Sequence, residues 1–233
     1  MNLSGYISRE LVEACVQDWH ELPPNSGISY RCFLDAASGV PEGDSYAIAI
    51  GHKLGDRVIV DSIREVRPPF SPAEVVNNVL LPLCRAYNIH SVSSDNYAAG
   101  FAQNLVRSAG LSFEPAKKHK SELYADPFLP LLNSRKIDLP RNERAIAQIC
   151  SLERSMQRSG REQITHAIHG HDDIANAIAG VADAVYNFTL FDTSWSFVDG
   201  TPYETDAERK QHESDDNFRW RLGNYMRSIG AAW

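Results

Sequence analysis

The order of the predicted elements indicates an α/β protein built on one mixed sheet. Three apolar runs of strand type lie within residues 30–63, and short connections join them, which predicts an antiparallel meander. Two helix–strand units follow within residues 72–113, and such units add parallel strands through helical crossovers. We therefore expect three antiparallel strands and then parallel strands, with helices on both faces of the sheet.

The N-terminal part of the chain carries a lead-in and then the meander. Residues 1–30 contain an expected helix from Arg9 to His20, followed by a proline-rich connection over residues 22–27. The three strands of the meander are expected at Tyr30 to Leu34, Tyr46 to Ile50 and Val58 to Ile63.

Capping signals place the first crossover helix at residues 72–87. Ser71 is the expected N-cap, Pro72 stands in the first turn, and Glu74 completes a capping box. Valines and leucines then recur at helical spacing. The second unit is expected as a strand from Ile89 to Ser93, a helix from Tyr97 to Ser108 and a strand from Leu111 to Phe113.

The remaining elements are mostly helical. Helices are expected from Ser121 to Asn133 and from Glu143 to Arg154, on either side of an extended Ile137 to Pro140. A last helix begins at His171, and its many alanines permit close approach to the sheet. We expect one domain over residues 31–187 and an aromatic, acidic tail over residues 188–233.

Composition excludes several classes of protein. The formal net charge of −7 argues against a protein that coats nucleic acid nonspecifically, because phosphate neutralisation supplies most of that affinity. No apolar run approaches the roughly 18 residues of a membrane span, and the N-terminus lacks a signal-peptide pattern, so we expect a cytoplasmic protein without a membrane partner. Four scattered cysteines predict free thiols in a reducing compartment.

Acidic residues stand at three points where elements begin or end. Asp35 follows the first strand, Asp95 follows the fourth, and Asp172 and Asp173 open the last helix. In the expected sheet the fourth strand lies beside the first, which places Asp95 beside Asp35. Each residue alone also suits a turn, a helix cap or a helix N-terminus. The conjunction of all three favours an acidic site.

Such a site suits divalent metal ions. Carboxylates a few ångströms apart raise one another's pKa, and a divalent cation relieves that repulsion. Mg²⁺ and Mn²⁺ prefer oxygen ligands, and two ions about 3.5–4 Å apart can activate an attacking water and stabilise a leaving oxygen. We predict a divalent-metal site formed by Asp35, Asp95 and the adjacent pair Asp172 and Asp173.

A compact basic patch follows the fifth expected strand. Lys117, Lys118 and Lys120 lie together in an otherwise acidic protein. A charge run is usually a solvated face, but near the carboxyl end of the sheet these lysines can steer a DNA backbone. No cysteine accompanies His171 to suggest zinc, so we predict a phosphate contact for it as well.

Taken together, these segments resemble the nuclease domain of the large terminase subunit of tailed bacteriophages, a member of the ribonuclease H-like (retroviral integrase) superfamily. The similarity runs from about Val12 to Ala184. It is carried by Leu34-Asp35-Ala36-Ala37-Ser38-Gly39, Gly43-Asp44-Ser45-Tyr46, Ile48-Ala49-Ile50-Gly51-His52, Ser94-Asp95-Asn96-Tyr97, Lys120-Ser121-Glu122-Leu123-Tyr124, Ile137-Asp138-Leu139-Pro140 and Gly170-His171-Asp172-Asp173-Ile174-Ala175-Asn176-Ala177.

The resemblance implies an endonuclease that cuts double-stranded viral DNA with little sequence preference during genome packaging. It also implies that Asp35, Asp95 and Asp173 are catalytic metal ligands for two ions, with Asp172 as the alternate ligand. The partners that it implies are a terminase ATPase motor, the small terminase subunit and the portal. Two departures stand out. Asn176 occupies a position that is often acidic in related resolvases, which predicts a weak second metal site. The sequence also has no GxxxxGK[ST] phosphate loop, so we expect an excised domain or a separately encoded nuclease.

Three other functions fit the same fold class. A junction resolvase would prefer branched DNA, and an RNA-directed hydrolase would respond to the 2′-hydroxyl. A non-catalytic docking module for packaging would need no acidic site, and the presence of all three acidic points counts against it.

Overall fold

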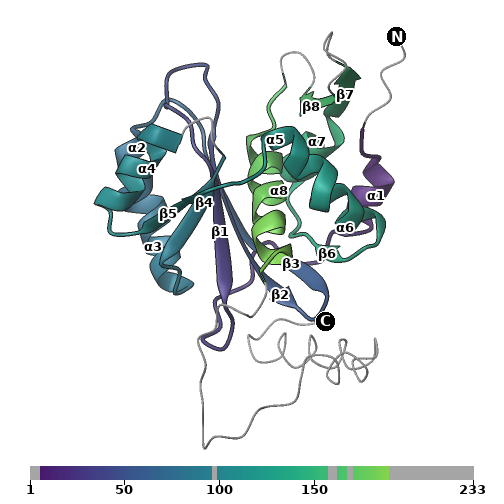
Figure 1. The fold of residues 1–233 in the computed structure, drawn as a ribbon, viewed down its shortest axis with the longest axis horizontal. Helices are drawn as coiled ribbons and strands as arrows, with labels where there is room; N and C mark the ends of the chain where they lie inside the picture. The colour runs from purple at the N-terminus through teal and green to yellow at the C-terminus, as the bar shows by residue number, and fades with distance from the viewer. Residues whose placement is uncertain (1–5, 96–98, 157–161, 167–169, 189–233) are drawn as a thin grey trace, which may run out of the picture.

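A computed structural model describes residues 6–95, 99–156, 162–166 and 170–188 (Figure 1). In this part of the chain, six strands form one mixed sheet in the order β5-β4-β1-β2-β3-β6. The strands β1 (Tyr30–Asp35), β2 (Tyr46–Leu54) and β3 (Arg57–Val66) pair antiparallel. The predicted meander is therefore confirmed.

Parallel strands extend the meander at both edges. On one side β4 (Ser91–Ser94) pairs with β1, and β5 (Ser112–Pro115) pairs with β4. On the other side β6 (Ile137–Asp138) pairs with β3. The expected placement of the fourth strand beside the first is confirmed, so the carboxyl ends of β1 and β4 lie next to each other.

The helix α8 (Asp173–Tyr186) covers one face of the sheet, against β1, β2 and β3 (Figure 1). Its small residues permit this approach, as predicted. A methyl group at Gly180 would lie 2.4 Å from the Phe33 ring, which is far closer than van der Waals contact allows. Four of its alanines are fully buried: Ala175, Ala177, Ala179 and Ala182.

Two helical segments cover the opposite face, so helices lie on both faces (Figure 1). One segment runs through α2 (Pro72–Val75), a π-helical turn (Val76–Leu80) and α3 (Leu81–Ala86), and the other is α4 (Ala99–Ser108). Their apolar side chains pack on those of the sheet in one cluster, which includes Leu34, Ile48, Ile50, Val76, Leu80 and Val106.

The predicted start of the first of these segments is right, but its predicted capping box is wrong. Ser71 is the N-cap residue, yet its side chain makes no capping hydrogen bond. The π-helical turn ends at Leu80, two residues before Pro82, which has no N–H to donate within the helix. The widened turn accommodates that missing donor without ending the segment.

The N-terminal helix is shorter than predicted. The helix α1 (Arg9–Glu13) ends where the chain begins to pair with the segment after β6. The amide of Leu139 donates to the Cys15 carbonyl (2.8 Å), and the amide of Gln17 donates to the Leu139 carbonyl (2.9 Å). These long-range bonds replace the helical bonds that the predicted helix to His20 would need.

The predicted helix from Glu143 to Arg154 is also too long. The helix α7 (Glu143–Cys150) ends before β7 (Leu152–Met156), which pairs antiparallel with β8 (Glu162–His166). The N-terminal segment meets this hairpin, because the Tyr6 amide donates to the Leu152 carbonyl (2.8 Å). The sequence pattern missed this hairpin.

The predicted helical stretch before β6 is confirmed, with one interruption. It comprises α5 (Lys120–Leu123), a π-helical turn (Tyr124–Phe128) and α6 (Leu129–Asn133). Asp126 leaves the helical conformation because it precedes Pro127, and the ring of a proline disfavours helical geometry in the residue before it.

Two further predictions concern other parts of the chain. All four cysteines are free thiols, as predicted. Among the described residues, no helix is long and apolar enough to cross a membrane. The predicted tail falls almost wholly in residues 189–233, outside the described part.

Candidate metal centre

Asp35 and Asp95 leave the same edge of the sheet. Asp35 ends β1, and Asp95 directly follows the parallel neighbour β4. Both side chains are largely buried, with 15% of the Asp35 side chain and 8% of Asp95 exposed to solvent. Asn176, one turn into α8, donates its Nδ2 to Asp95 Oδ2 (3.2 Å). The end of the sheet and the start of α8 therefore meet at these carboxylates.

Asp173 is the first residue of α8 and faces the same space. The amide of Ser45, just before β2, donates to Asp173 Oδ2 (3.0 Å). A cleft of about 990 Å³ is lined by Asp35, Asp95 and Asp173 together. The structure thus brings the three predicted aspartates to one cleft.

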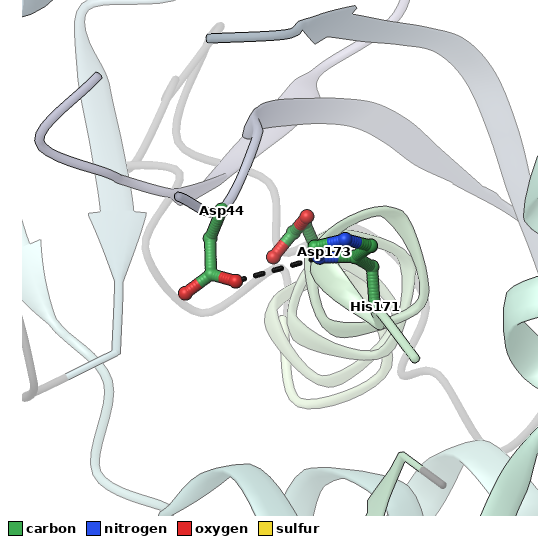
Figure 2. Close-up of side chains that lie close together, drawn as sticks. All are labelled: Asp44, His171 and Asp173. Atoms are coloured by element: carbon green, nitrogen blue, oxygen red, sulfur yellow. Dashed lines mark ion pairs between the residues drawn. The ribbon is translucent and has the colours of Figure 1, made fainter. Parts of the chain in front are cut away.

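Asp44 and His171 lie beside Asp173, as Figure 2 shows. His171 Nδ1 is 3.5 Å from Asp44 Oδ1, and one ligand atom from each of the three residues lies within 4.8 Å of the others. The sequence reasoning did not select Asp44 as a site residue. An aspartate between glycine and serine before a strand is typical of a turn, and only its place beside Asp173 distinguishes it.

Asp172 faces a different set of partners from its neighbour. Its side chain is 2% exposed and accepts hydrogen bonds from Lys120 Nζ (2.7 Å) and the Tyr124 hydroxyl (2.9 Å). Asp172 does not line the cleft, whereas Asp173 does. The two aspartates that the sequence left as alternatives therefore differ in what their carboxylates contact.

The structure brings only one of the three predicted lysines to the acidic residues. Lys120 Nζ lies 3.7 Å from Asp35 Oδ2, in addition to its bond with Asp172. Lys118 is instead paired with Asp126 and Asp183, each at 2.9 Å. Lys117 is exposed to solvent. The lysine patch is thus divided between an ion-pair network, the cleft and the surface.

The first turn of α8 is held by a side chain from α7. Gln148 Oε1 accepts from the amide of Ile174 (2.8 Å) and from the amide of Ala175 (3.2 Å). These amides belong to the first turn of the helix, whose N–H groups have no partner within the helix itself. Gln148 therefore fixes where α8 begins and, with it, the position of Asp173.

The electrostatics of the cleft disfavour the ionised carboxylates. Burial, with the nearby charges of Asp95 and Asp173, raises the pKa of Asp35 to about 8, although Lys120 and a hydrogen bond from Asn176 oppose the shift. Burial also raises the pKa of Asp173, against the lowering effect of the Ser45 amide. Burial opposes the charge on Lys120, but Asp35 and Asp172 outweigh it and raise the Lys120 pKa.

These residues fit a divalent cation. Among the described residues, Asp35 Oδ2 and Asn176 Oδ1 are buried oxygens without a hydrogen-bond donor. Carboxylate and amide oxygens are the ligands that Mg²⁺ and Mn²⁺ prefer, and a cation would offset the burial and the carboxylate repulsion that raise the pKa of Asp35. The donor set is richer in oxygen than zinc sites usually are.

Comparison with known proteins places the fold. No protein-family model and no curated protein sequence matches the chain. The large terminase nuclease from thermophilic phage G20c is similar in structure, with a TM-score of 0.64 and 14% identity over 80% of this chain and all of that one. Its magnesium-bound crystal structure gives a TM-score of 0.63 and 15% identity over 75% of this chain and 94% of that one.

Two other large terminase structures are matched over less than half of their chains. For the HK97 bacteriophage large terminase the TM-score is 0.61, with 14% identity over 78% of this chain and 44% of that chain. The described part of this chain, with its six-stranded mixed sheet between helices, is similar to these structures over three quarters or more of the chain. The chain therefore has the ribonuclease H-like fold of the large terminase nuclease domain.

Proposed function

We propose that the chain is a metal-dependent nuclease that cuts double-stranded DNA. The observation that carries this proposal is the meeting of Asp35, Asp95 and Asp173 in one cleft, with buried oxygens that lack hydrogen-bond donors. Carboxylates at the ends of rigid elements suit a phosphodiester hydrolase that uses divalent ions. The likeness to terminase nuclease structures, one of which contains magnesium, supports the same function.

In this proposal Asp35, Asp95 and Asp173 hold Mg²⁺ or Mn²⁺, as two ions. Asp44 and His171 stand next to Asp173, with one ligand atom from each residue within 4.8 Å of the others, so Asp44 is a further candidate ligand. The bound metal would supply the positive charge needed for water to attack the phosphodiester bond. Lys117 and His171, both exposed to solvent, are proposed contacts for DNA phosphates.

The proposed biological setting is genome packaging, with little sequence preference in the cut. The partners we propose are the terminase ATPase motor, the small terminase subunit and the portal. The likeness to one segment of full-length large terminases supports this setting.

A non-catalytic docking module is the second candidate. One observation favours it: Asn176, a neutral residue, binds Asp95 from a buried position beside the proposed metal ligands. A neutral ligand weakens cation binding relative to a carboxylate. This candidate predicts a folded protein that binds packaging components and leaves DNA intact.

The deciding experiment is cleavage of supercoiled plasmid in Mg²⁺, Mn²⁺ or chelator. We expect metal-dependent nicking and linearisation by the wild type, and loss of both in Asp35→Asn and Asp173→Asn. Asp56→Asn is the matched control, because Asp56 lies at the β2–β3 turn with its side chain 70% exposed. Folded wild-type protein that leaves the plasmid intact with either metal would favour the docking module.

A further inference from the structure

Lys120 stands between two carboxylates of the acidic site. It is the first residue of α5, whose start is fixed by a capping box in which the His119 amide donates to Glu122 Oε2 (2.8 Å). From there its Nζ lies 2.7 Å from Asp172 Oδ1 and 3.7 Å from Asp35 Oδ2. Only a third of its side chain is exposed. A charge this close to Asp35 and this shielded affects the site directly.

The two distances indicate unequal interactions. At 2.7 Å the ammonium group donates a charge-assisted hydrogen bond to Asp172. At 3.7 Å it acts on Asp35 by charge without a hydrogen bond, which leaves Asp35 Oδ2 available to another partner. Lys120 is therefore tied to Asp172 and acts on Asp35 from a distance.

The anchor for Lys120 is itself firmly held. The Tyr124 hydroxyl, one helical turn beyond Lys120, donates to Asp172 Oδ2 (2.9 Å), so both carboxylate oxygens of Asp172 have partners. A buried carboxylate with a cation and a hydroxyl donor is stable, and the loss of either partner is costly. Both carboxylate oxygens of Asp172 are therefore engaged by protein side chains, while Asp173 lines the cleft.

We propose that Lys120 is a positioning residue for Asp35, held in place by Asp172 and Tyr124, and that Asp172 lies outside the metal-ligand set. This inference rests on the proposed function and names the residues that prepare the site. The positive charge of Lys120, 3.7 Å from Asp35, offsets the repulsion between Asp35 and its neighbouring carboxylates before metal binds. Lys120 also neutralises the charge of Asp172. The negative charge available to divalent ions is therefore that of the three proposed ligands.

The test uses the whole chain and two measurements that do not depend on cutting DNA. Thermal unfolding is measured in chelator and in saturating Mn²⁺, and Mn²⁺ affinity is measured by calorimetry. The variants are Lys120→Met, Tyr124→Phe and the double variant Lys120→Met with Asp172→Asn, which leaves no buried unpaired charge if Lys120→Met alone fails to fold. Lys118→Met is the control, because Lys118 pairs with Asp126 and Asp183.

We expect the Lys120 variants to unfold at least about 3 °C lower than wild type in chelator, with most of that loss recovered in Mn²⁺. Mn²⁺ should bind these variants about tenfold more tightly, because a repelling cation beside Asp35 has gone. Lys120→Arg should restore wild-type behaviour in both measurements. Lys118→Met should lose the same stability with and without metal.

Three results would overturn the inference. A tenfold or greater loss of Mn²⁺ affinity in the double variant would make Asp172 a metal ligand. A Lys120→Met stability loss that Mn²⁺ does not reduce would make Lys120 a purely structural residue. Equal changes in stability and Mn²⁺ affinity in the Lys118 and Lys120 variants would show that Lys120 has no specific role at the site. If wild-type protein binds no Mn²⁺, the proposed function fails instead, while the chelator comparison still reports whether Lys120 holds the acidic residues together.

Discussion

Asp172 and Asp173 are adjacent in the chain, yet their carboxylates accept hydrogen bonds from different parts of the protein. Asp172 accepts from Lys120 and Tyr124, and Asp173 accepts from the Ser45 amide and lines the cleft. The change of direction occurs at the N-cap of α8, where Asp172 has non-helical backbone angles (φ −136°, ψ 20°) and Asp173 begins the helix. One residue therefore faces the protein and the next faces the cleft.

Substitution of these two aspartates should separate cutting from stability. Asp173→Asn should lower the rate of plasmid nicking by at least about 100-fold. It should leave the metal-free protein as stable or more stable, because burial already disfavours the Asp173 charge, as its raised pKa indicates. Asp172→Asn should instead retain plasmid nicking and lower the unfolding temperature, because it removes the charged partner of Lys120. Equal loss of nicking and of metal binding in both variants would contradict this separation.

A carboxylate at position 176 should lower the stability of the metal-free protein and raise its affinity for metal. Asn176 is fully buried and its Nδ2 donates to Asp95, so Asn176→Asp places a like charge there. We expect a loss of about 1–3 kcal/mol in the free energy of unfolding in chelator, recovered in saturating Mg²⁺. Asn176→Ala serves as the control, since it removes the hydrogen bond without adding charge. Calorimetry showing no tighter Mg²⁺ binding by Asn176→Asp would exclude position 176 from the ligand set.

The stability of the metal-free protein should fall as pH rises from about 4 to 8. The folded-state pKa of Asp35 is about 8, against an ordinary value of 3.8, so the folded protein holds a proton that the unfolded chain has released. A raised folded-state pKa gives stability that is lost as the pH rises toward that value. Unfolding temperatures in chelator should show this fall, and Asp35→Asn should flatten it. An unchanged slope in Asp35→Asn would mean that other groups cause the pH dependence.

Two glycines should respond oppositely to alanine. Gly180→Ala places a methyl group 2.4 Å from the Phe33 ring beneath α8, so we expect about 1–3 kcal/mol of destabilisation from overpacking. Gly100 lies in the exposed first turn of α4, and a methyl group there would meet no neighbouring atom within 4 Å. Gly100→Ala should therefore raise the free energy of unfolding by about 0.5–1 kcal/mol. Chemical denaturation of both variants tests the pair. A neutral Gly180→Ala would mean that α8 can move away from the sheet.

Local signals in the sequence predicted the sheet and the three cleft aspartates. Alternating apolar runs, turn residues and capping residues depend on nearby positions, and β1 to β5 follow from them. The parallel pairing of β1 with β4 then places Asp35 near Asp95 without knowledge of side chains. The general position of the site is therefore accessible from pattern and topology.

Two of the errors share a physical cause, which is dependence on partners distant in the chain. The first helix ends at Glu13 because the following residues bond to Leu139. The hairpin after α7 is a separate case, because its two strands lie close together in sequence. Asp44 joins the site only through its spatial neighbours, His171 and Asp173. No periodicity or capping signal carries these contacts.

The capping of α8 by Gln148 also limits how the N-terminus of this helix can bind a phosphate group. A helix N-terminus attracts anions through its unpaired amides, and many proteins bind phosphate groups there. Here the amides of Ile174 and Ala175 already donate to Gln148, so this end of α8 has fewer amides to offer a DNA backbone. Under the proposed function, attraction of the DNA backbone then falls to bound metal ions and to exposed side chains such as Lys117, in a protein whose net charge is −7.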